Sequence, residues 1–118
     1  MSTFSKEILS GSTTGKNIKV VATATAGTLI HTSVSGTTHK DEIWLYAVNS
    51  SGSDVYLTIE FGGTSSPDDT ILVPIQAYTG AKLVVPGFIL QNSLVVRAFA
   101  SIANVILING YVNRITVS

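Results

Sequence analysis

From residue 18 onward the chain consists of short β-prone segments separated by turn residues, at intervals of about 8 to 14 residues. No segment between them is long enough to form a helix and also has the 3.6-residue apolar period that a helix needs. This spacing predicts an all-β, antiparallel sandwich or barrel in one domain. The expected strands are IKVVATAT (18–25), TLIHTSV (28–34), EIWLYAVN (42–49), DVYLTIEF (54–61), TILVPIQAY (70–78), KLVVPGFIL (82–90), SLVVRAFA (93–100), ANVILIN (103–109) and YVNRITV (111–117). Asn109-Gly110, between the last two, is a type I′ hairpin signal.

Two of the expected strands lack a polar face. In residues 54–61 apolar side chains alternate with largely polar ones, which is typical of a strand with one face in water. Residues 42–49 and 93–100 are apolar on both faces. Because a two-layer sandwich buries only one face of each strand, the second apolar face needs another cover. We therefore expect Trp44 and Phe99 to lie at a subunit interface.

The charge content also indicates assembly. Charged residues are 12% of the 118 residues, where about 25% is usual, while apolar residues are 45% and the formal net charge is zero. A chain of this mass exposes roughly 6,100 Å² when folded, so each charged residue serves about 440 Å² of surface. Two explanations remain open: serine and threonine supply neutral polar cover, or part of the surface is buried against another subunit.

The first sixteen residues differ in composition from the rest. They are rich in serine, threonine and glycine, and their only large apolar side chains after Met1 are Phe4, Ile8 and Leu9. The absence of alternation predicts a flexible N-terminal arm over residues 1–16, followed by a sandwich domain over residues 17–118. We expect the three apolar side chains of the arm to anchor it on a partner.

Candidate chemical sites are few. Residues 60–70, EFGGTSSPDDT, contain the adjacent carboxylates Asp68 and Asp69, but their place between two expected strands and the Pro-Asp-Asp-Thr order favour a structural turn over a metal site or an acid/base pair. His31 and His39 are the only histidines, and we expect each to be solvated or hydrogen-bonded; His39 with Asp41 is a weak candidate metal pair. Catalytic, cofactor-binding and metal sites are therefore not expected.

The sequence also disfavours nucleotide binding, nucleic-acid binding and a membrane location. Gly11-Ser-Thr-Thr-Gly-Lys16 approaches a phosphate-binding loop, but it has one residue too few between its glycines and precedes an expected strand. The basic residues form no stripe, so we expect no nucleic-acid partner. No apolar run approaches the roughly 18 residues of a membrane span and no signal-peptide pattern is present, so we expect a soluble chain. There is no cysteine.

Several segments together resemble small structural proteins of tailed bacteriophages, closest to capsid decoration or cement proteins. They are Ile43–Asn49, Asp54–Gly63, Leu83–Gly87, Leu94–Ala100 and Asn109–Arg114. The resemblance implies a jelly-roll-like β-sandwich of about eight strands and a non-enzymatic protein of the virion surface, made in the host cytoplasm. It further implies a homo-oligomer, commonly a trimer, that binds between major capsid subunits and stabilises the shell.

Two other functions stay open. One is a receptor-binding or fibre-tip module, with carbohydrate as a candidate ligand that stacks on Trp44, Tyr46, Tyr56 or Tyr78. Aromatic residues inside strands are more often core residues, which disfavours this function. The other is a small hydrolase, which the scarcity of histidine and carboxylate disfavours.

Overall fold

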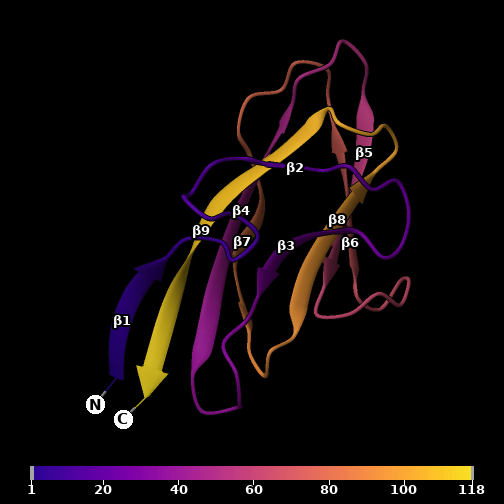
Figure 1. The fold of residues 1–118 in the computed structure, drawn as a ribbon. Helices are drawn as coiled ribbons and strands as arrows, with labels where there is room; N and C mark the ends of the chain where they lie inside the picture. Colours follow the sequence, from indigo (N-terminus) through magenta and orange to yellow (C-terminus); the bar gives the residue numbers. More distant parts are fainter. Residues whose placement is uncertain (1, 118) are drawn as a thin grey trace.

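Two antiparallel sheets pack face to face in the computed structural model, which describes residues 2–117 (Figure 1). Sheet A has the strand order β1-β9-β4-β7, with β2 also paired to β9, and sheet B has the order β3-β8-β5-β6. The described residues contain no helix. The prediction of an all-β antiparallel sandwich is thus confirmed. The strands are β1 (Ser2–Glu7), β2 (Ile18–Lys19), β3 (Thr28–Thr32), β4 (Lys40–Asn49), β5 (Val55–Phe61), β6 (Thr70–Ile75), β7 (Lys82–Leu90), β8 (Val95–Ala100) and β9 (Ile106–Val117).

The strand pairing is nested. The innermost pair is β5 with β6; around it β4 pairs with β7, β3 with β8, and finally β1 and β2 with β9. β1 lies opposite residues 112–117 of β9 and β2 lies opposite residues 107–108, so the two short strands form one interrupted strand. Eight antiparallel strands nested in this way, four to a sheet, are a jelly roll.

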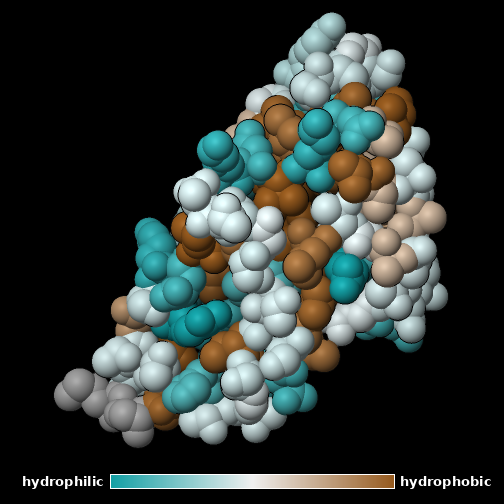
Figure 2. Space-filling view, viewed as in Figure 1, coloured by the Kyte–Doolittle hydropathy of each residue, from teal (hydrophilic) through white to brown (hydrophobic). Residues whose placement is uncertain are grey.

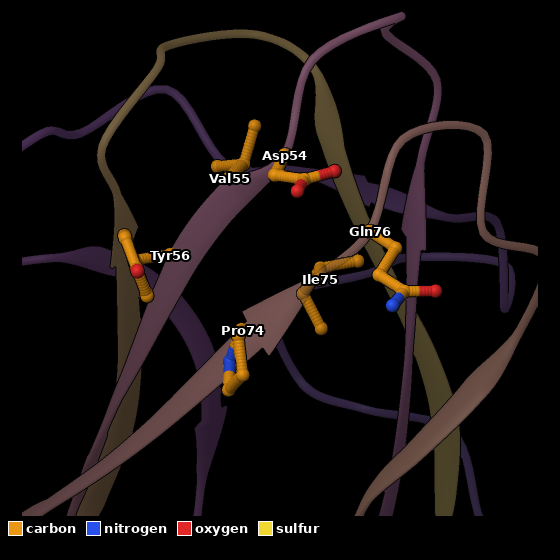
Figure 3. A pocket seen from close by; sticks show the side chains of 6 residues that line it. All are labelled: Asp54, Val55, Tyr56, Pro74, Ile75 and Gln76. Carbon is orange, nitrogen blue, oxygen red and sulfur yellow. The ribbon is translucent and has the colours of Figure 1, made fainter.

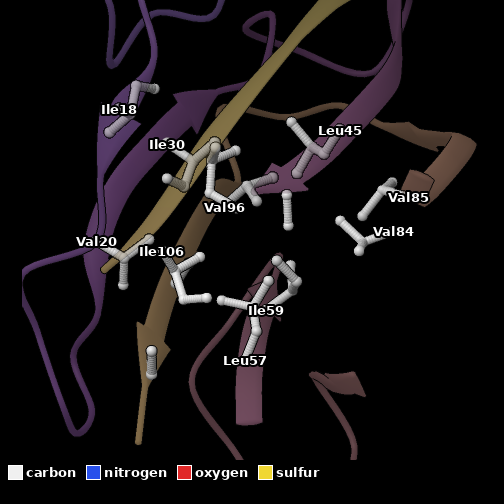
Figure 4. Packing of buried hydrophobic residues seen from close by; sticks show 14 of the residues in the cluster. Ile18, Val20, Ile30, Leu45, Leu57, Ile59, Val84, Val85, Val96 and Ile106 are labelled. Carbon is white, nitrogen blue, oxygen red and sulfur yellow. The ribbon is translucent and has the colours of Figure 1, made fainter. Parts of the chain in front are cut away.

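The core lies between the sheets, where both contribute alternate side chains. In β4 the residues at odd-numbered positions are buried and those between them are partly exposed. Figure 4 shows isoleucine, leucine and valine side chains from both sheets meeting in this layer. The largest apolar side chains that are fully buried are Leu9, Val20, Ile30, Ile43, Leu45, Leu57, Ile59, Ile75, Ile106 and Ile108.

A β-bulge in β3 breaks this alternation. The register of β3 against β8 shifts between Leu29 and His31. Because the bulge adds one residue on β3, the consecutive residues Ile30 and His31 are both buried. The bulge therefore brings a histidine into the interior, where an unbroken strand would have placed it outside.

The structure differs from the expected arm over residues 1–16. Residues 2–7 form β1, whose backbone pairs along its whole length with β9. Farther along, Leu9 is only 2% exposed and belongs to the core, and the Gly11 amide donates to the Ile30 carbonyl at 2.9 Å. The segment is held mainly by backbone hydrogen bonds. Because these bonds do not require particular side chains, the sequence shows no apolar periodicity there. Met1 lies outside the described residues.

The predicted hairpin at Asn109-Gly110 is wrong, because both residues lie inside the continuous strand β9. Gly110 faces the neighbouring strand so closely that a Cβ there would collide with the carbonyl oxygen of Trp44. The Asn109 side chain accepts a hydrogen bond from the Gly110 amide at 2.7 Å. The glycine thus serves close strand approach rather than a turn.

The position of Leu9 leads to a stability prediction. Leu9→Ala should lower the free energy of unfolding by about 3 kcal/mol, because it leaves a cavity in the core. Phe4→Ala, in the same segment, should change it by less than about 0.5 kcal/mol, because Phe4 is 76% exposed. Urea unfolding of both variants measures this difference. Equal, small effects would show that residues 8–11 are not part of the folded domain.

Candidate functional site

The five residues expected at an interface do not share one surface. Phe4 on β1 and Ile8 after it are 76% and 49% exposed. Leu9, by contrast, is buried in its own core and is unavailable to a partner, so the sequence assigned it to the wrong environment. Trp44 and Phe99 are both half-buried, but Trp44 lies on the outer face of sheet A and Phe99 on the outer face of sheet B. The sandwich therefore has two separate outer faces to consider.

The outer face of sheet B carries an apolar patch, called here the sheet B patch. Thr58 on β5 lies opposite Leu72 on one side and Phe99 on the other, and Tyr56 lies opposite Pro74. Tyr56 is 61% exposed and Leu72 is 65% exposed. Three neighbouring strands thus place four apolar side chains around Thr58; Tyr56, Leu72 and Pro74 are exposed and Phe99 is half-buried.

A small pocket adjoins the sheet B patch (Figure 3). Its volume is about 160 Å³, and two neighbouring strands and the residues that flank them provide its walls, with Tyr56 and Pro74 shared with the patch. Asp54 is the one charged residue in the wall, and its carboxylate accepts a hydrogen bond from the Ala77 amide at 3.0 Å. The Asp54 carboxylate is therefore already used to hold the turn after β6.

The outer face of sheet A has a different chemistry. Trp44 on β4 and Tyr111 on β9 are register partners, and their rings lie 6.2 Å apart, centroid to centroid, at an interplanar angle of 15°. The Trp44 indole N–H donates to Glu42 Oε1 at 2.7 Å, and the Asn113 amide donates to the same oxygen at 2.9 Å. Lys6 Nζ lies 4.6 Å from the centre of the Tyr111 ring. These five residues are called here the sheet A platform.

Hydrogen bonding sets the charge state of Glu42. The bonds from Asn113 and Trp44 lower the pKa of the Glu42 carboxyl, and the slight burial of the group opposes them only weakly. Glu42 is therefore a carboxylate at neutral pH. The sequence had no signal for this cluster, because its members come from three strands that are far apart in the chain.

A buried ionic network joins the two sheets. The Asp41 carboxylate on β4 is fully buried and accepts two hydrogen bonds from Arg114 on β9, at 2.8 and 3.1 Å. It also accepts a bond of 3.0 Å from the Val34 amide and contacts His31 Nε2 on β3 at 2.9 Å. Burial alone would raise the pKa of Asp41, but the hydrogen bonds from Arg114 and His31 and the charge of Arg114 outweigh it and hold that pKa below its usual value.

The same network determines the tautomer of His31. His31 Nδ1 accepts a hydrogen bond from the Ser10 backbone amide at 3.0 Å, so the ring proton is on Nε2 and points to Asp41. Ser10, His31 and Asp41 resemble a hydrolase triad in composition only. In a triad the serine hydroxyl donates to the histidine, whereas the Ser10 hydroxyl here accepts the Thr32 amide at 2.6 Å. The expectation of a hydrogen-bonded His31 is confirmed.

A second buried carboxylate holds the loop between β2 and β3 in place. Glu60 on β5 is fully buried and accepts hydrogen bonds from the Gly27 amide at 2.7 Å and the Thr25 hydroxyl at 2.8 Å. These bonds hold the chain between β2 and β3 across sheet B. Because the chain crosses sheet B to make these bonds, the strand expected over residues 18–25 is limited to its first two residues.

The stretch from residue 60 to residue 70 is confirmed as a structural turn. The Asp69 carboxylate accepts the Ser65 amide at 3.1 Å, and the Asp69 amide donates to the Ser65 carbonyl at 2.8 Å. His39 and Asp41 do not form a site together, since His39 accepts the Val117 amide at 2.9 Å. Across residues 2–117 no group of three or more ligating side chains has metal-binding geometry.

The Asp41 network leads to a pH-dependent prediction. In the wild type the lowered pKa of Asp41 contributes stability that is complete above the unfolded-state value near 4 and is lost as the pH falls through the folded-state value. Arg114→Met removes the charge that offsets burial, so the pKa of Asp41 should rise. The variant should lose about 3 kcal/mol at pH 7, and this deficit should shrink as the pH is lowered to about 3.

Urea unfolding of wild type and variant across this pH range makes the measurement. Lys19→Met is the matched control, because it removes one positive charge from an exposed position on β2. A deficit that stays constant with pH, or equals that of the control, would mean that Asp41 does not depend on Arg114.

The structure contains no helix long and apolar enough to cross a membrane, in the part of the chain that it describes. Comparison of the chain with protein-family models, curated proteins and solved structures finds no match.

Proposed function

We propose that this chain is a non-enzymatic structural protein of a virion, a decoration or cement protein that binds between major capsid subunits and stabilises the shell. The observation that carries the proposal is the sheet B patch, where the exposed side chains of Tyr56, Leu72 and Pro74 lie near the half-buried Phe99. Contiguous apolar surface on a folded protein marks a site of protein contact. The jelly-roll topology and the resemblance to phage decoration proteins support the same role.

The energetics of the patch suit an assembling protein. Burying a large apolar side chain contributes about 1.5 to 3 kcal/mol, so Tyr56, Leu72 and Phe99 together offset part of the cost of association, and a specific contact also involves residues around the patch. Two basic side chains border the patch: Arg97 on β8, and Lys82, whose ammonium donates to the Pro74 carbonyl at 3.1 Å. We propose that the patch contacts either a second copy of the chain, in a trimer, or the major capsid protein.

A receptor-binding module is the second candidate function. It is favoured by a specific observation on the opposite sheet: the stacked rings of Trp44 and Tyr111 with Glu42 and Asn113 beside them. Such a module uses the sheet A platform and leaves the sheet B patch free for attachment to the particle. The two functions are therefore compatible in one chain.

The sheet B patch yields a prediction about assembly. Leu72→Lys replaces an exposed apolar side chain of the patch, on the edge strand β6, with a charge and should weaken self-association and attachment to virus particles by at least about tenfold. Because Leu72 is 65% exposed, the melting temperature should stay within a few degrees of wild type. Sedimentation equilibrium measures self-association, and co-sedimentation with purified particles measures attachment.

Ile89→Lys, on the edge strand β7 of sheet A, is the matched control, because Ile89 is also exposed and apolar. It should leave both measurements unchanged. A wild-type chain that is monomeric at micromolar concentration and absent from particles would overturn the proposed function.

A further inference from the structure

Trp44 and Tyr111 are held in place before any ligand arrives. The Trp44 indole is fixed by its hydrogen bond to Glu42 and lies against Gly87, where an added Cβ would come within 2.8 Å of the ring. Gly87 has a positive φ of 80°, so a side chain is disfavoured there for both reasons. Tyr111 is stacked on Trp44, and Lys6 Nζ lies over the Tyr111 ring. Two nearly parallel rings on a strand face, already ordered, form a preorganised stacking surface.

Unused acceptors lie beside the rings. Glu42 Oε1 is occupied by Trp44 and Asn113, but Glu42 Oε2 and the Asn113 amide oxygen receive no hydrogen bond from residues 2–117. Both groups are only partly buried, so a ligand can reach them. A carboxylate and an amide next to an aromatic ring accept hydroxyl hydrogen bonds in the plane of a molecule stacked on that ring.

Two hollows extend the platform along β9. One, of about 280 Å³, is lined by Phe4, Glu42, Asn113 and Ile115. The other, of about 360 Å³, is lined by Tyr46, Ala81, Asn109, Gly110 and Tyr111. From position 109 to position 115 a strand rises roughly 20 Å. The two hollows follow one another along β9 over about that length, and together with the two rings they are called here the track.

The chemistry of the track matches a particular class of ligand. A pyranose ring has an apolar face of C–H groups that stacks on an aromatic ring and hydroxyl groups at its edge that bond to carboxylates and amides. Nucleic acid is disfavoured, because Lys6 is the one basic residue on the platform. The track differs from the sheet B patch because its aromatic rings and the apolar Phe4 and Ile115 lie beside a carboxylate and an amide, Glu42 and Asn113. On the face of the molecule seen in Figure 2, hydrophobic residues lie among hydrophilic ones.

We propose that the outer face of sheet A binds an extended neutral oligosaccharide, which stacks on Trp44 and Tyr111 and bonds to Glu42 and Asn113. The track holds several sugar units, with the two hollows taking the units on either side of the rings. This proposal does not depend on the decoration role, because it uses the opposite face of the sandwich.

Trp44 is the single tryptophan of the chain, so intrinsic fluorescence reports directly on the platform. The experiment titrates the full chain with neutral hexasaccharides of glucose, mannose, galactose and N-acetylglucosamine. At least one of them should give a saturable change in Trp44 emission, with a Kd of about 1 mM or tighter. Tyr111→Ala should weaken this binding at least about tenfold, while Tyr111→Phe, which keeps the ring, should retain most of it.

Glu42→Gln tests the polar contacts separately, because it keeps the shape of the side chain and removes the charge. It should weaken binding by about tenfold. Tyr56→Ala, on the sheet B patch, is the control and should bind the sugar as wild type does. Melting temperatures identify any variant that fails to fold. If Tyr111→Ala is unstable, the test compares the sugar affinities of Tyr111→Phe and Glu42→Gln instead.

The outcomes separate this proposal from the decoration role. No saturable change with any of the four hexasaccharides overturns it, as does equal binding by wild type, Tyr111→Ala and Glu42→Gln. Loss of self-association in Tyr111→Ala without sugar binding by the wild type also overturns it, since the face is then a protein interface. Loss of particle attachment in Leu72→Lys with unchanged sugar binding supports both proposals independently.

Discussion

The buried Asp41 carboxylate is the group on which the geometry of this sandwich depends. A charge in the interior is very costly unless it is paired and hydrogen-bonded, so the folded state requires Arg114, His31 and the Val34 amide to reach it at once. Those partners come from β9, β3 and the loop after β3. One carboxylate thus fixes the position of sheet B relative to sheet A at this end of the molecule.

Asp41 also positions the N-terminal segment, indirectly through His31. Asp41 orients the His31 ring, and the ring then accepts the Ser10 amide, which leads directly to the buried side chain of Leu9. β1 precedes this anchor and completes the edge of sheet A beside β9. As a result Phe4 and Lys6 stand on the same outer face as Tyr111, and the sheet A platform exists because the segment is ordered.

The two outer faces differ in chemistry. In each sheet only every second residue of a strand faces outward, and strand pairing brings a different set of these outward side chains together in each sheet. Sheet B exposes Tyr56, Leu72 and Phe99 without charged partners between them. Sheet A exposes Trp44 and Tyr111 with Glu42 hydrogen-bonded between two strands. We therefore propose protein contact for the first face and oligosaccharide binding for the second, and each face is open to its own test.

The sequence by itself determined that the chain is all-β, where most strands lie and that residues 60–70 form a turn. Segments such as 82–90 coincide with observed strands because alternation and turn residues act between near neighbours in the chain. It also indicated that Trp44 and Phe99 lie on second apolar faces. It missed β1, because a strand held at an edge by backbone bonds needs no apolar pattern, and it misplaced a turn at Asn109-Gly110, where the glycine serves close approach to Trp44.

Only the tertiary structure decided which residues meet. Asp41 and Arg114 are 73 positions apart, and Glu42 and Asn113 are 71 apart, so no local pattern indicates either contact. Whether an apolar residue such as Leu9 belongs to the core or to an interface likewise depends on the strands that surround it. Local sequence determines the conformation of each segment, whereas strand pairing depends on the free energy of the whole assembly of strands. For that reason only the folded chain shows which side chains make up each outer face.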